Sequence, residues 1–197
     1  QTHVPFAMDC LERGVATLVE KPVADNVADG MRLAEAADRL KVPLLVGHHR
    51  RHNPINRRAR EIVQSGRLGQ IVNVNAMASM YKPDSYYDAE WRRAPGGGPI
   101  LINLIHDIDM IIGLANSAVE SVDAVGTPVI GRNIDLANAR ITFASGCVAN
   151  VTASRVAYKT ERKLRVFARN HYLSCDLGEG RIQGYRLRGD PMTEGLA

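Results

Sequence analysis

Apolar positions in the first fifty residues follow a helical period in some stretches and form short apolar runs in others. This pattern predicts a helix, a strand, a second helix and a second strand, over Pro5–Arg13, Val15–Val19, Val27–Leu40 and Val42–Gly47. Gly14 closes the first helix, and Asp25 or Asn26 can cap the second. A strand, a helix and a strand in this order imply two parallel strands joined by a right-handed crossover.

From residue 53 onward the helices come first and the strands follow. Asn53 can cap an amphipathic helix that starts at Pro54 and ends before Gly66. A strand over Gln70–Met80, a polar loop over Tyr81–Pro99 and a helix over about Ile100–Leu114 come next. Six strand-like runs then lie near 119–126, 135–143, 147–156, 163–169, 171–176 and 181–187.

These elements predict a mixed α/β (α+β) fold: the end of a Rossmann-type parallel sheet, then an open, largely antiparallel sheet with helices on one face. A polar stretch near 47–53 marks the boundary between two domains. We expect one domain over residues 1–48 and a second over residues 49–197, the second truncated at its end. An apolar fraction of 45% is enough to bury a core in each.

Charge and cysteine content narrow the function classes. The net charge of +4 is spread along the chain without a basic tail, which argues against nucleic acid as a partner. The spacing of Cys10, Cys147 and Cys175 excludes a zinc knuckle or a paired redox motif and favours a reducing, cytoplasmic compartment. No apolar run reaches the length of about 18 residues that suggests a membrane span.

The tripeptide Glu20-Lys21-Pro22 follows the first predicted strand. Open α/β sheets place ligand-contacting groups at the carboxyl ends of their strands. Proline keeps Lys21 out of the helical region, so its ammonium extends from a fixed backbone. From these three residues alone, a surface lysine in a turn is the more common outcome.

The second candidate is the predicted helix after Gly96-Gly97-Gly98. Asn103, His106 and Asp107 share one face of it with Met110, at positions i, i+3, i+4 and i+7. The other side is apolar and consists of Leu101, Leu104, Ile105, Ile108, Ile111 and Ile112. The polar face can be simply solvated, or it can line a site, since the glycines allow backbone to approach a ligand closely.

A third segment, Gly47 to Pro54, carries three histidines and two arginines just beyond the second strand. It can be a polar linker, a pocket rim or a metal site, but histidines without a carboxylate at a defined spacing indicate zinc only weakly. We therefore expect no metal. Trp91 and Arg92, in the loop before the glycines, can form a buried anchor or a cover over a pocket.

Taken together in this order, the three segments resemble the Gfo/Idh/MocA family of glucose–fructose oxidoreductases and inositol dehydrogenases. The resemblance implies an amino-terminal Rossmann domain that binds NAD or NADP and an α/β domain that holds the substrate. No G-x-G-x-x-G phosphate loop occurs in the 197 residues, so we expect a fragment that begins after that loop. By itself, such a fragment is expected neither to bind NAD(P) usefully nor to turn over substrate.

Carried over residue by residue, Lys21 matches the catalytic lysine of the family and His106 its catalytic histidine. The family often has an aspartate four residues before this histidine, where this chain has Ile102, and Asn103 is the nearest polar residue. The implied reaction is hydride transfer between a secondary alcohol and NAD(P), with a sugar, cyclitol or related polyol as the small-molecule substrate. The resemblance also implies a homo-oligomer paired through the open sheet. We expect apolar residues at alternating positions of Ala137–Phe143 and Val148–Val156 to form its contact patch.

The implied site residues fall into three groups. The catalytic group is Lys21, His106 and Asn103. The cofactor-binding group is Glu20, Lys21, Pro22, His49 and Arg50. The substrate-binding group is Arg51, Trp91, Arg92, Asn103 and His106. Two other classes remain open: a non-catalytic NAD(P)-fold sensor, and a metal-dependent hydrolase or lyase that uses His48, His49, His106 and Asp107.

Overall fold

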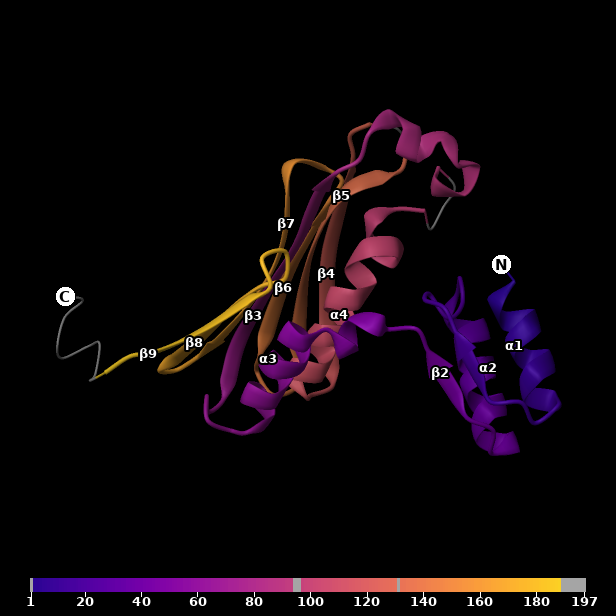
Figure 1. Ribbon diagram of the computed structural model, residues 1–197, viewed down its shortest axis with the longest axis horizontal. Helices are drawn as coiled ribbons and strands as arrows, with labels where there is room; N and C mark the ends of the chain where they lie inside the picture. Colours follow the sequence, from indigo (N-terminus) through magenta and orange to yellow (C-terminus); the bar gives the residue numbers. More distant parts are fainter. Residues whose placement is uncertain (1, 94–96, 131, 189–197) are drawn as a thin grey trace. The chain divides into compact units, whose positions relative to one another are not determined.

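Two helices and two short parallel strands make up the first of two units in the computed structural model, which describes residues 2–93, 97–130 and 132–188 (Figure 1). This unit covers residues 1–49 and the second covers residues 50–197. Its elements are α1 (His3–Glu12), β1 (Thr17–Val19), α2 (Val27–Leu40) and β2 (Leu44–Val46). The strands pair in parallel, with Val19 opposite Val46. The predicted parallel strand–helix–strand arrangement is confirmed.

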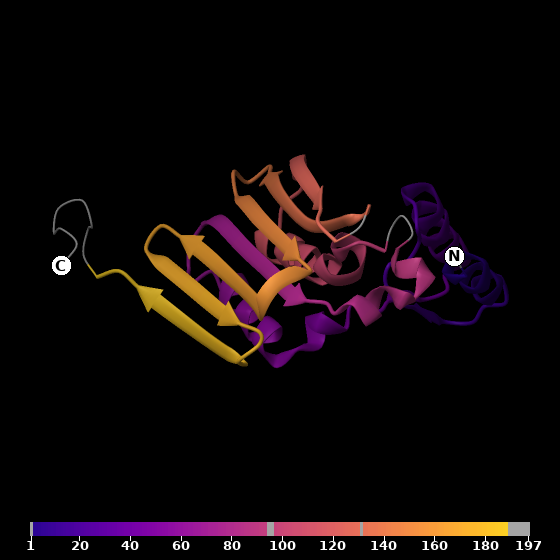
Figure 2. The same ribbon diagram turned by 90° about the horizontal axis from the view of Figure 1, so that it is seen from above.

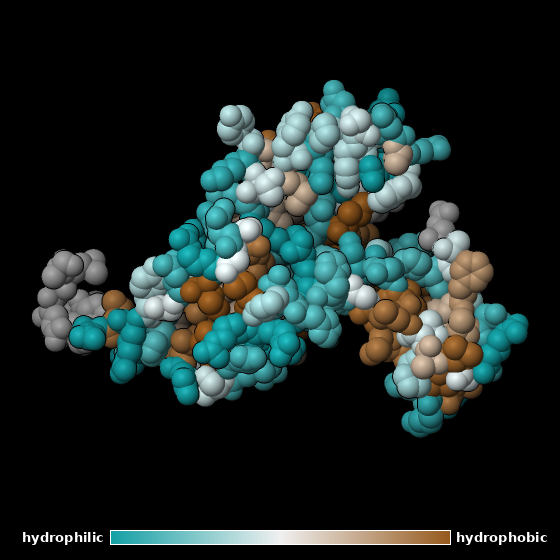
Figure 3. All heavy atoms as spheres, in the orientation of Figure 1, coloured by the Kyte–Doolittle hydropathy of each residue, from teal (hydrophilic) through white to brown (hydrophobic). Residues whose placement is uncertain are grey.

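Local sequence explains where the elements of the first unit begin and end. The Asn26 side chain accepts a hydrogen bond from the Asp29 amide at 2.9 Å and so caps α2. Apolar side chains of both helices and of β1 form a small core: Val4, Ala7, Leu11, Val19, Leu33, Ala36 and Ala37. Leu18 and Leu45, which are register partners, are both exposed, and hydrophobic side chains gather at the surface of this unit (Figure 3).

The second unit is one sheet of seven strands with helices on one face (Figure 2). Its longer helices are α3 (Pro54–Gln64) and α4 (Ile105–Ala115). Short helical turns lie at His49–His52, Asp84–Asp88 and Glu90–Arg92, and a π-helical turn over Ile100–Leu104 leads into α4. The strands are β3 (Ile71–Tyr81), β4 (Val119–Pro128), β5 (Ile134–Phe143), β6 (Val148–Ser154), β7 (Val156–Ala168), β8 (His171–Asp176) and β9 (Arg181–Arg186).

The spatial order of the strands is β4-β5-β6-β3-β7-β8-β9. Only the β3–β6 pair is parallel, and the other neighbours are antiparallel. The predicted open, largely antiparallel sheet is therefore confirmed. The β3–β6 pair brings the strand before the His106 helix next to a strand that is 75 residues away in sequence, since Asn73 faces Val148.

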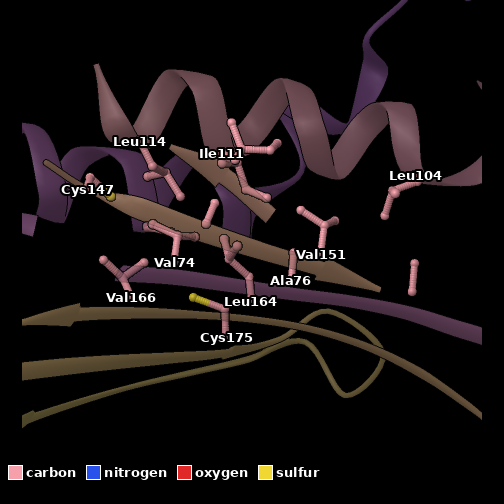
Figure 4. Close-up of a cluster of buried hydrophobic side chains, with 14 of the residues drawn as sticks. Val74, Ala76, Leu104, Ile111, Leu114, Cys147, Val151, Leu164, Val166 and Cys175 are labelled. Atoms are coloured by element: carbon pink, nitrogen blue, oxygen red, sulfur yellow. The ribbon is translucent and has the colours of Figure 1, made fainter. Parts of the chain in front are cut away.

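The core of the second unit lies between the sheet and the two longer helices (Figure 4). Leu104, Ile111 and Leu114 project from the α4 region onto the sheet and are almost fully buried. Asn53 caps α3, because its side chain accepts hydrogen bonds from the amides of Ile55 and Asn56. This cap and Pro54 in the first turn were both predicted from the sequence.

One sequence prediction about a strand of this unit was wrong. The run 147–156 was predicted as one strand, but the chain leaves β6 after Ser154 and begins β7 at Val156, and Arg155 lies between them. The apolar side of the predicted 100–114 helix is partly covered: Leu104 and Ile111 are buried, whereas Leu101 and Ile112 are 37% and 45% exposed. The helix buries its polar face as well, so the apolar residues at its margins remain in solvent.

The open face of the sheet also differs from expectation. Alternating apolar residues of β5 and β6 were expected to form a patch for oligomer contact, but Ile141, Phe143 and Val151 lie in the core beneath the helices. The opposite face of β5 and β6 carries Asn138 and Thr152, which are hydrogen bonded to each other. On the edge strand β4, Val125 is exposed on this open face opposite Asn138, whereas the exposed Val119 and Val122 lie on the helix side, opposite the core residues Phe143 and Ile141.

None of the helices in the described part of the chain is long and apolar enough to cross a membrane.

The three cysteines differ in environment, and this difference predicts their reactivity. Cys147 and Cys175 are 1% and 0% exposed, and burial raises the pKa of Cys175 to about 12, whereas Cys10 is half-buried. Because the thiolate is the reactive form, the two buried thiols should react with Ellman's reagent at pH 8 at least about 100-fold more slowly in the native than in the unfolded protein. Rapid labelling of more than one thiol in the native protein, or of any thiol in Cys10→Ser, would contradict this.

Candidate active site

The carboxyl ends of β1 and β2 bring two of the three predicted segments together. Because Val19 pairs with Val46, the residues that follow, Glu20-Lys21-Pro22 and Gly47-His48-His49, leave the sheet at the same edge. This edge is where a parallel α/β sheet presents ligand-contacting groups. Lys21 is half-buried there, and the carbonyl oxygen of Pro22 lies 2.9 Å from Nδ1 of His3.

Gly47 packs closely against the Glu20 side chain at this edge. A Cβ at this position would lie 3.1 Å from the carboxylate oxygens of Glu20, so a larger residue would displace that side chain. The Glu20 carboxylate also accepts a hydrogen bond from the Lys21 amide at 3.3 Å. Glu20 is thus held over the end of the neighbouring strand, next to the backbone that presents the lysine.

The polar face of α4 is buried and not solvated. His106 and Asp107 are each 4% exposed, and Met110 on the same face is 6% exposed. Burying an imidazole and a carboxylate on one face of a helix is costly unless polar partners are present. The solvated alternative considered from the sequence is therefore excluded, and this face borders a polar interior.

A buried ion pair ties this face to strand β7. The Arg162 guanidinium contacts both carboxylate oxygens of Asp107, with Nε donating to Oδ1 at 3.1 Å, and a second nitrogen donates to the carbonyl oxygen of Asn103 at 3.0 Å. The side chains of Arg162 and Asp107 are 10% and 5% exposed. Burial raises the pKa of Asp107, and the adjacent guanidinium opposes that rise. The pair thereby fixes the helix turn that carries His106.

Asn103 is held by a second buried arginine. Arg155, 1% exposed, donates from Nε and Nη2 to the Asn103 side-chain oxygen at 3.3 Å and from Nη1 to the carbonyl oxygen of Gly97 at 2.7 Å. Asn103 lies in the π-helical turn before α4, and such turns are frequent at functional sites. The amide that was predicted as an orienting residue is therefore itself fixed in place.

The glycine segment before α4 lies partly outside the described residues, since Gly96 belongs to the stretch 94–96. Gly97 lies against the backbone of its own loop: a Cβ there would come within 2.5 Å of the carbonyl oxygen of Trp91. Glycine is thus needed at this position for close packing of the loop.

The two arginines after the second strand have different surroundings. Burial, and next the charge of Arg162, lower the pKa of Arg50, whereas the charge of Asp107 raises it. Arg51 forms a bidentate ion pair with Asp109 of α4, with nitrogen–oxygen distances of 2.7 and 2.5 Å, and hydrogen bonding to this carboxylate raises the pKa of Arg51. This pair connects the segment before α3 to the helix that carries His106.

Trp91 is 55% exposed, which excludes the buried anchor considered from the sequence. Arg92 stacks on it, with 5.1 Å from the guanidinium carbon to the indole ring, and donates to the carbonyl oxygen of Tyr86 at 2.6 Å. Arg92 also lines a cavity of about 480 Å³, together with Arg155. The loop before α4 therefore borders a cavity in the second unit.

Within residues 2–93, 97–130 and 132–188, no group of three or more His, Cys, Asp and Glu side chains is arranged to hold a metal ion. Asp107, a ligand in the metal-dependent alternative, has both carboxylate oxygens in contact with Arg162. The chemistry of this face is that of an imidazole next to a carboxylate–guanidinium pair.

The sequence reasoning missed Arg155 and Arg162, the two residues that organise this face. Arg155 interrupts an otherwise apolar and small-residue run, and such an interruption could have marked it as a buried polar position. Arg162 fell just before a strand predicted to begin at residue 163, whereas β7 begins at Val156. That the Arg162 side chain points towards α4 follows only from the register of β7 in the sheet.

Comparison with known proteins gives two family matches that cover most of the chain. Residues 56–174 match the GFO/IDH/MocA C-terminal domain, and residues 1–48 match the oxidoreductase family with an NAD-binding Rossmann fold. The first match covers more than half of the 197 residues and includes His106.

Among curated relatives, UDP-N-acetylglucosamine 3-dehydrogenase of Acidithiobacillus ferrooxidans is 28% identical over 196 residues, which is 99% of this chain and 58% of the relative. Myo-inositol 2-dehydrogenase of Thermotoga maritima is 26% identical over 184 residues, 89% of this chain and 53% of the relative. The chain thus spans little more than half the length of these relatives.

Among solved structures, the WlbA dehydrogenase of Chromobacterium violaceum in complex with NADH and UDP-GlcNAcA superposes with a TM-score of 0.84 at 27% identity. The match covers 98% of this chain and 58% of that one. The matched family domains, the arrangement of the strands and the buried histidine on α4 agree with one another. The chain therefore belongs to the Gfo/Idh/MocA family of oxidoreductases.

Proposed function

We propose that the full-length protein oxidises a secondary alcohol of a sugar, cyclitol or related polyol and transfers the hydride to NAD. The observation that carries this proposal is the buried His106 on α4, within the region matched to the C-terminal domain of the family. Relatives named as sugar and inositol dehydrogenases support the reaction class. A structural relative solved with NADH supports NAD as the cofactor, and NADP is the alternative cofactor.

The first unit fits a nicotinamide cofactor at the edge where its parallel strands end. There the Glu20 carboxylate packs over Gly47, and Lys21 and Pro22 follow directly. When bound, NAD supplies the hydride acceptor. We assign cofactor contacts to Glu20, Lys21, Pro22, His49 and Arg50. We also assign residues 1–48 to the NAD-binding domain and 49–197 to the substrate domain.

In this mechanism His106 accepts the hydroxyl proton of the substrate, because a neutral imidazole is a suitable base near pH 7. The Lys21 ammonium hydrogen bonds to the same oxygen and stabilises the negative charge that develops on it. Asn103, held by Arg155, orients the substrate or the imidazole. Arg51, Trp91 and Arg92 are the further candidates for substrate contact.

We also propose a homo-oligomer that uses the open side of the sheet. The exposed apolar side chain of Val125 on β4, which lies on this face opposite Asn138, supports this surface. A monomer in light scattering of the full-length protein at high concentration would remove this proposal. The three free thiols support a reducing, cytoplasmic compartment.

The reaction is tested by mixing the full-length protein with NAD and a panel of myo-inositol, free hexoses and UDP-N-acetylglucosamine, and following the absorbance of NADH. We expect NADH to form with at least one polyol and to require His106. Tight NAD binding without turnover of any polyol would favour the non-catalytic sensor. Loss of turnover with a chelator, and recovery with zinc, would favour the metal-dependent class.

A further inference from the structure

Three cationic side chains surround one tyrosine ring at the end of β3. The Lys82 ammonium lies 4.7 Å from the centroid of the Tyr86 ring. The guanidinium carbons of Arg92 and Arg155 lie 4.1 Å and 5.3 Å from the same centroid. Each contact with the ring is favourable by itself, but the three positive charges repel one another. Burial, and next the charges of Arg155 and Arg92, lower the pKa of Lys82.

The cluster borders the cavity of about 480 Å³, whose walls come from the loop after β3, the β4–β5 connection and the β6–β7 junction. Its charged lining residues are Asp84, Arg92, Arg93, Arg132, Asp135 and Arg155. Four guanidinium groups thus face two carboxylates. A volume of this size is within the range of small-molecule sites, roughly 300–1,000 Å³.

The carboxylate deepest in this lining is already occupied by its own chain. Asp135, 3% exposed, accepts hydrogen bonds from the amides of Val129 and Ile130 at 3.0 and 2.8 Å and from the Tyr87 hydroxyl at 3.3 Å. Of the exposed arginines, Arg93 pairs with Asp88 at 3.7 Å. The Asp135 and Asp88 carboxylates are therefore bound by groups other than Lys82, Arg92 and Arg155.

Within the described residues, no carboxylate forms an ion pair with Lys82, Arg92 or Arg155. Arg155 is 1% exposed, and its acceptors, the carbonyl of Gly97 and the amide oxygen of Asn103, are neutral. The Nε atom of Arg92 is buried and has no hydrogen-bond partner in the described part of the chain. A buried charge without a counter-ion is costly, so this arrangement is suited to receive an anion.

We propose that this cavity binds an anionic group of the substrate, a carboxylate or a phosphate, through the guanidinium groups of Arg92 and Arg155. The guanidinium fork matches both groups in a bidentate geometry. Arg155 also holds Asn103, one helical turn before His106, so the anion site and the proposed base are connected within one unit. This inference rests on the proposed function and specifies its substrate as an acidic or phosphorylated sugar or polyol.

The test is isothermal titration of the 197-residue chain at constant ionic strength with three probes: glucuronate, glucose 1-phosphate and neutral glucose. We expect at least one anionic probe to bind and glucose to bind at least about tenfold more weakly, since a hydrogen bond to a charged group contributes roughly 1.5–3 kcal/mol, or about 10- to 150-fold. Preference for glucuronate identifies a carboxylate subsite, and preference for glucose 1-phosphate identifies a phosphate subsite.

Arg92→Gln should weaken binding of the preferred anion by at least about tenfold. Arg140→Gln, which removes the same charge from an exposed position on β5, should change it by less than about twofold. Arg155→Gln is expected to have the largest effect, and Lys82→Gln provides a second, partly exposed variant if Arg155→Gln does not fold. Absence of anion binding, equal binding of glucose, or an equal loss in Arg140→Gln would overturn the proposal.

The outcome is separable from that of the proposed function. Anion binding to the chain, without NADH formation by the full-length protein, would retain the subsite and reject the dehydrogenase. Turnover of neutral polyols, together with no anion binding, would retain the dehydrogenase and reject the subsite.

Discussion

Removing the imidazole of His106 is expected to lower kcat of the full-length protein by about 100-fold or more, while the affinity for NAD stays within roughly tenfold. General base catalysis contributes about 10²- to 10⁴-fold, and the buried position of His106 suits it to a protein-enclosed reaction centre. Lys21→Ala should have an effect of similar size, because the stabilisation of a developing alkoxide is realised mainly in the transition state. Steady-state kinetics with NAD titrations measure both.

Matched controls distinguish a chemical role from a structural one. His171→Ala on β8 and Lys159→Ala on β7 remove the same groups from positions outside the proposed site and should leave kcat within about twofold. Circular dichroism should show that His106→Ala is folded. Near-normal turnover in either His106→Ala or Lys21→Ala would remove that residue from the mechanism.

Arg162→Met is expected to destabilise the second unit by about 3–5 kcal/mol, the largest effect on stability that we predict. The substitution leaves the Asp107 carboxylate buried without its counter-ion and takes a donor from the carbonyl oxygen of Asn103. Arg58→Met removes an exposed pair with Glu61 and should cost less than about 1 kcal/mol. Urea denaturation followed by circular dichroism measures the difference.

The stability lost in Arg162→Met is also expected to depend on pH. Burial raises the pKa of Asp107 above its ordinary value of 3.8, and Arg162→Met removes the largest opposing influence, so that mainly the charge of Arg50 still opposes the rise. A carboxyl group whose pKa is higher in the folded than in the unfolded state favours folding at low pH and loses that contribution as pH rises through the folded pKa. The difference in free energy of unfolding between Arg162→Met and the unaltered protein should therefore become smaller as pH falls from 7 towards 4.

A second substitution in this variant checks the cause. Asp107→Leu combined with Arg162→Met replaces both charges by apolar groups and should recover a large part of the lost stability, because no unpaired charge remains. A double variant as unstable as Arg162→Met, or a single variant that loses less than 1 kcal/mol, would show that the ion pair is not what holds α4 on the sheet.

The secondary structure was predictable because its determinants are local. The Asn26 and Asn53 caps, Pro54 in the first turn of α3 and the alternation along the strands each act within a few residues. The end of β6 at Ser154 was not predictable in this way. Arg155 leaves the strand pattern to reach Gly97 and Asn103, which are more than 50 residues away in sequence.

The candidate site shows the same division. Lys21 and His106 were found from motifs in the sequence, since the residues around each of them form a contiguous pattern. The sequence by itself thus determined the elements, the family resemblance and the two proposed catalytic residues. Only the tertiary structure decided that the polar face of α4 is buried. Its burial depends on Arg155, between β6 and β7, and on Arg162 of β7, which contact Asn103 and Asp107 although they are more than 50 residues away in sequence. Burial and charge pairing are properties of contacts between distant segments, and no local period encodes them.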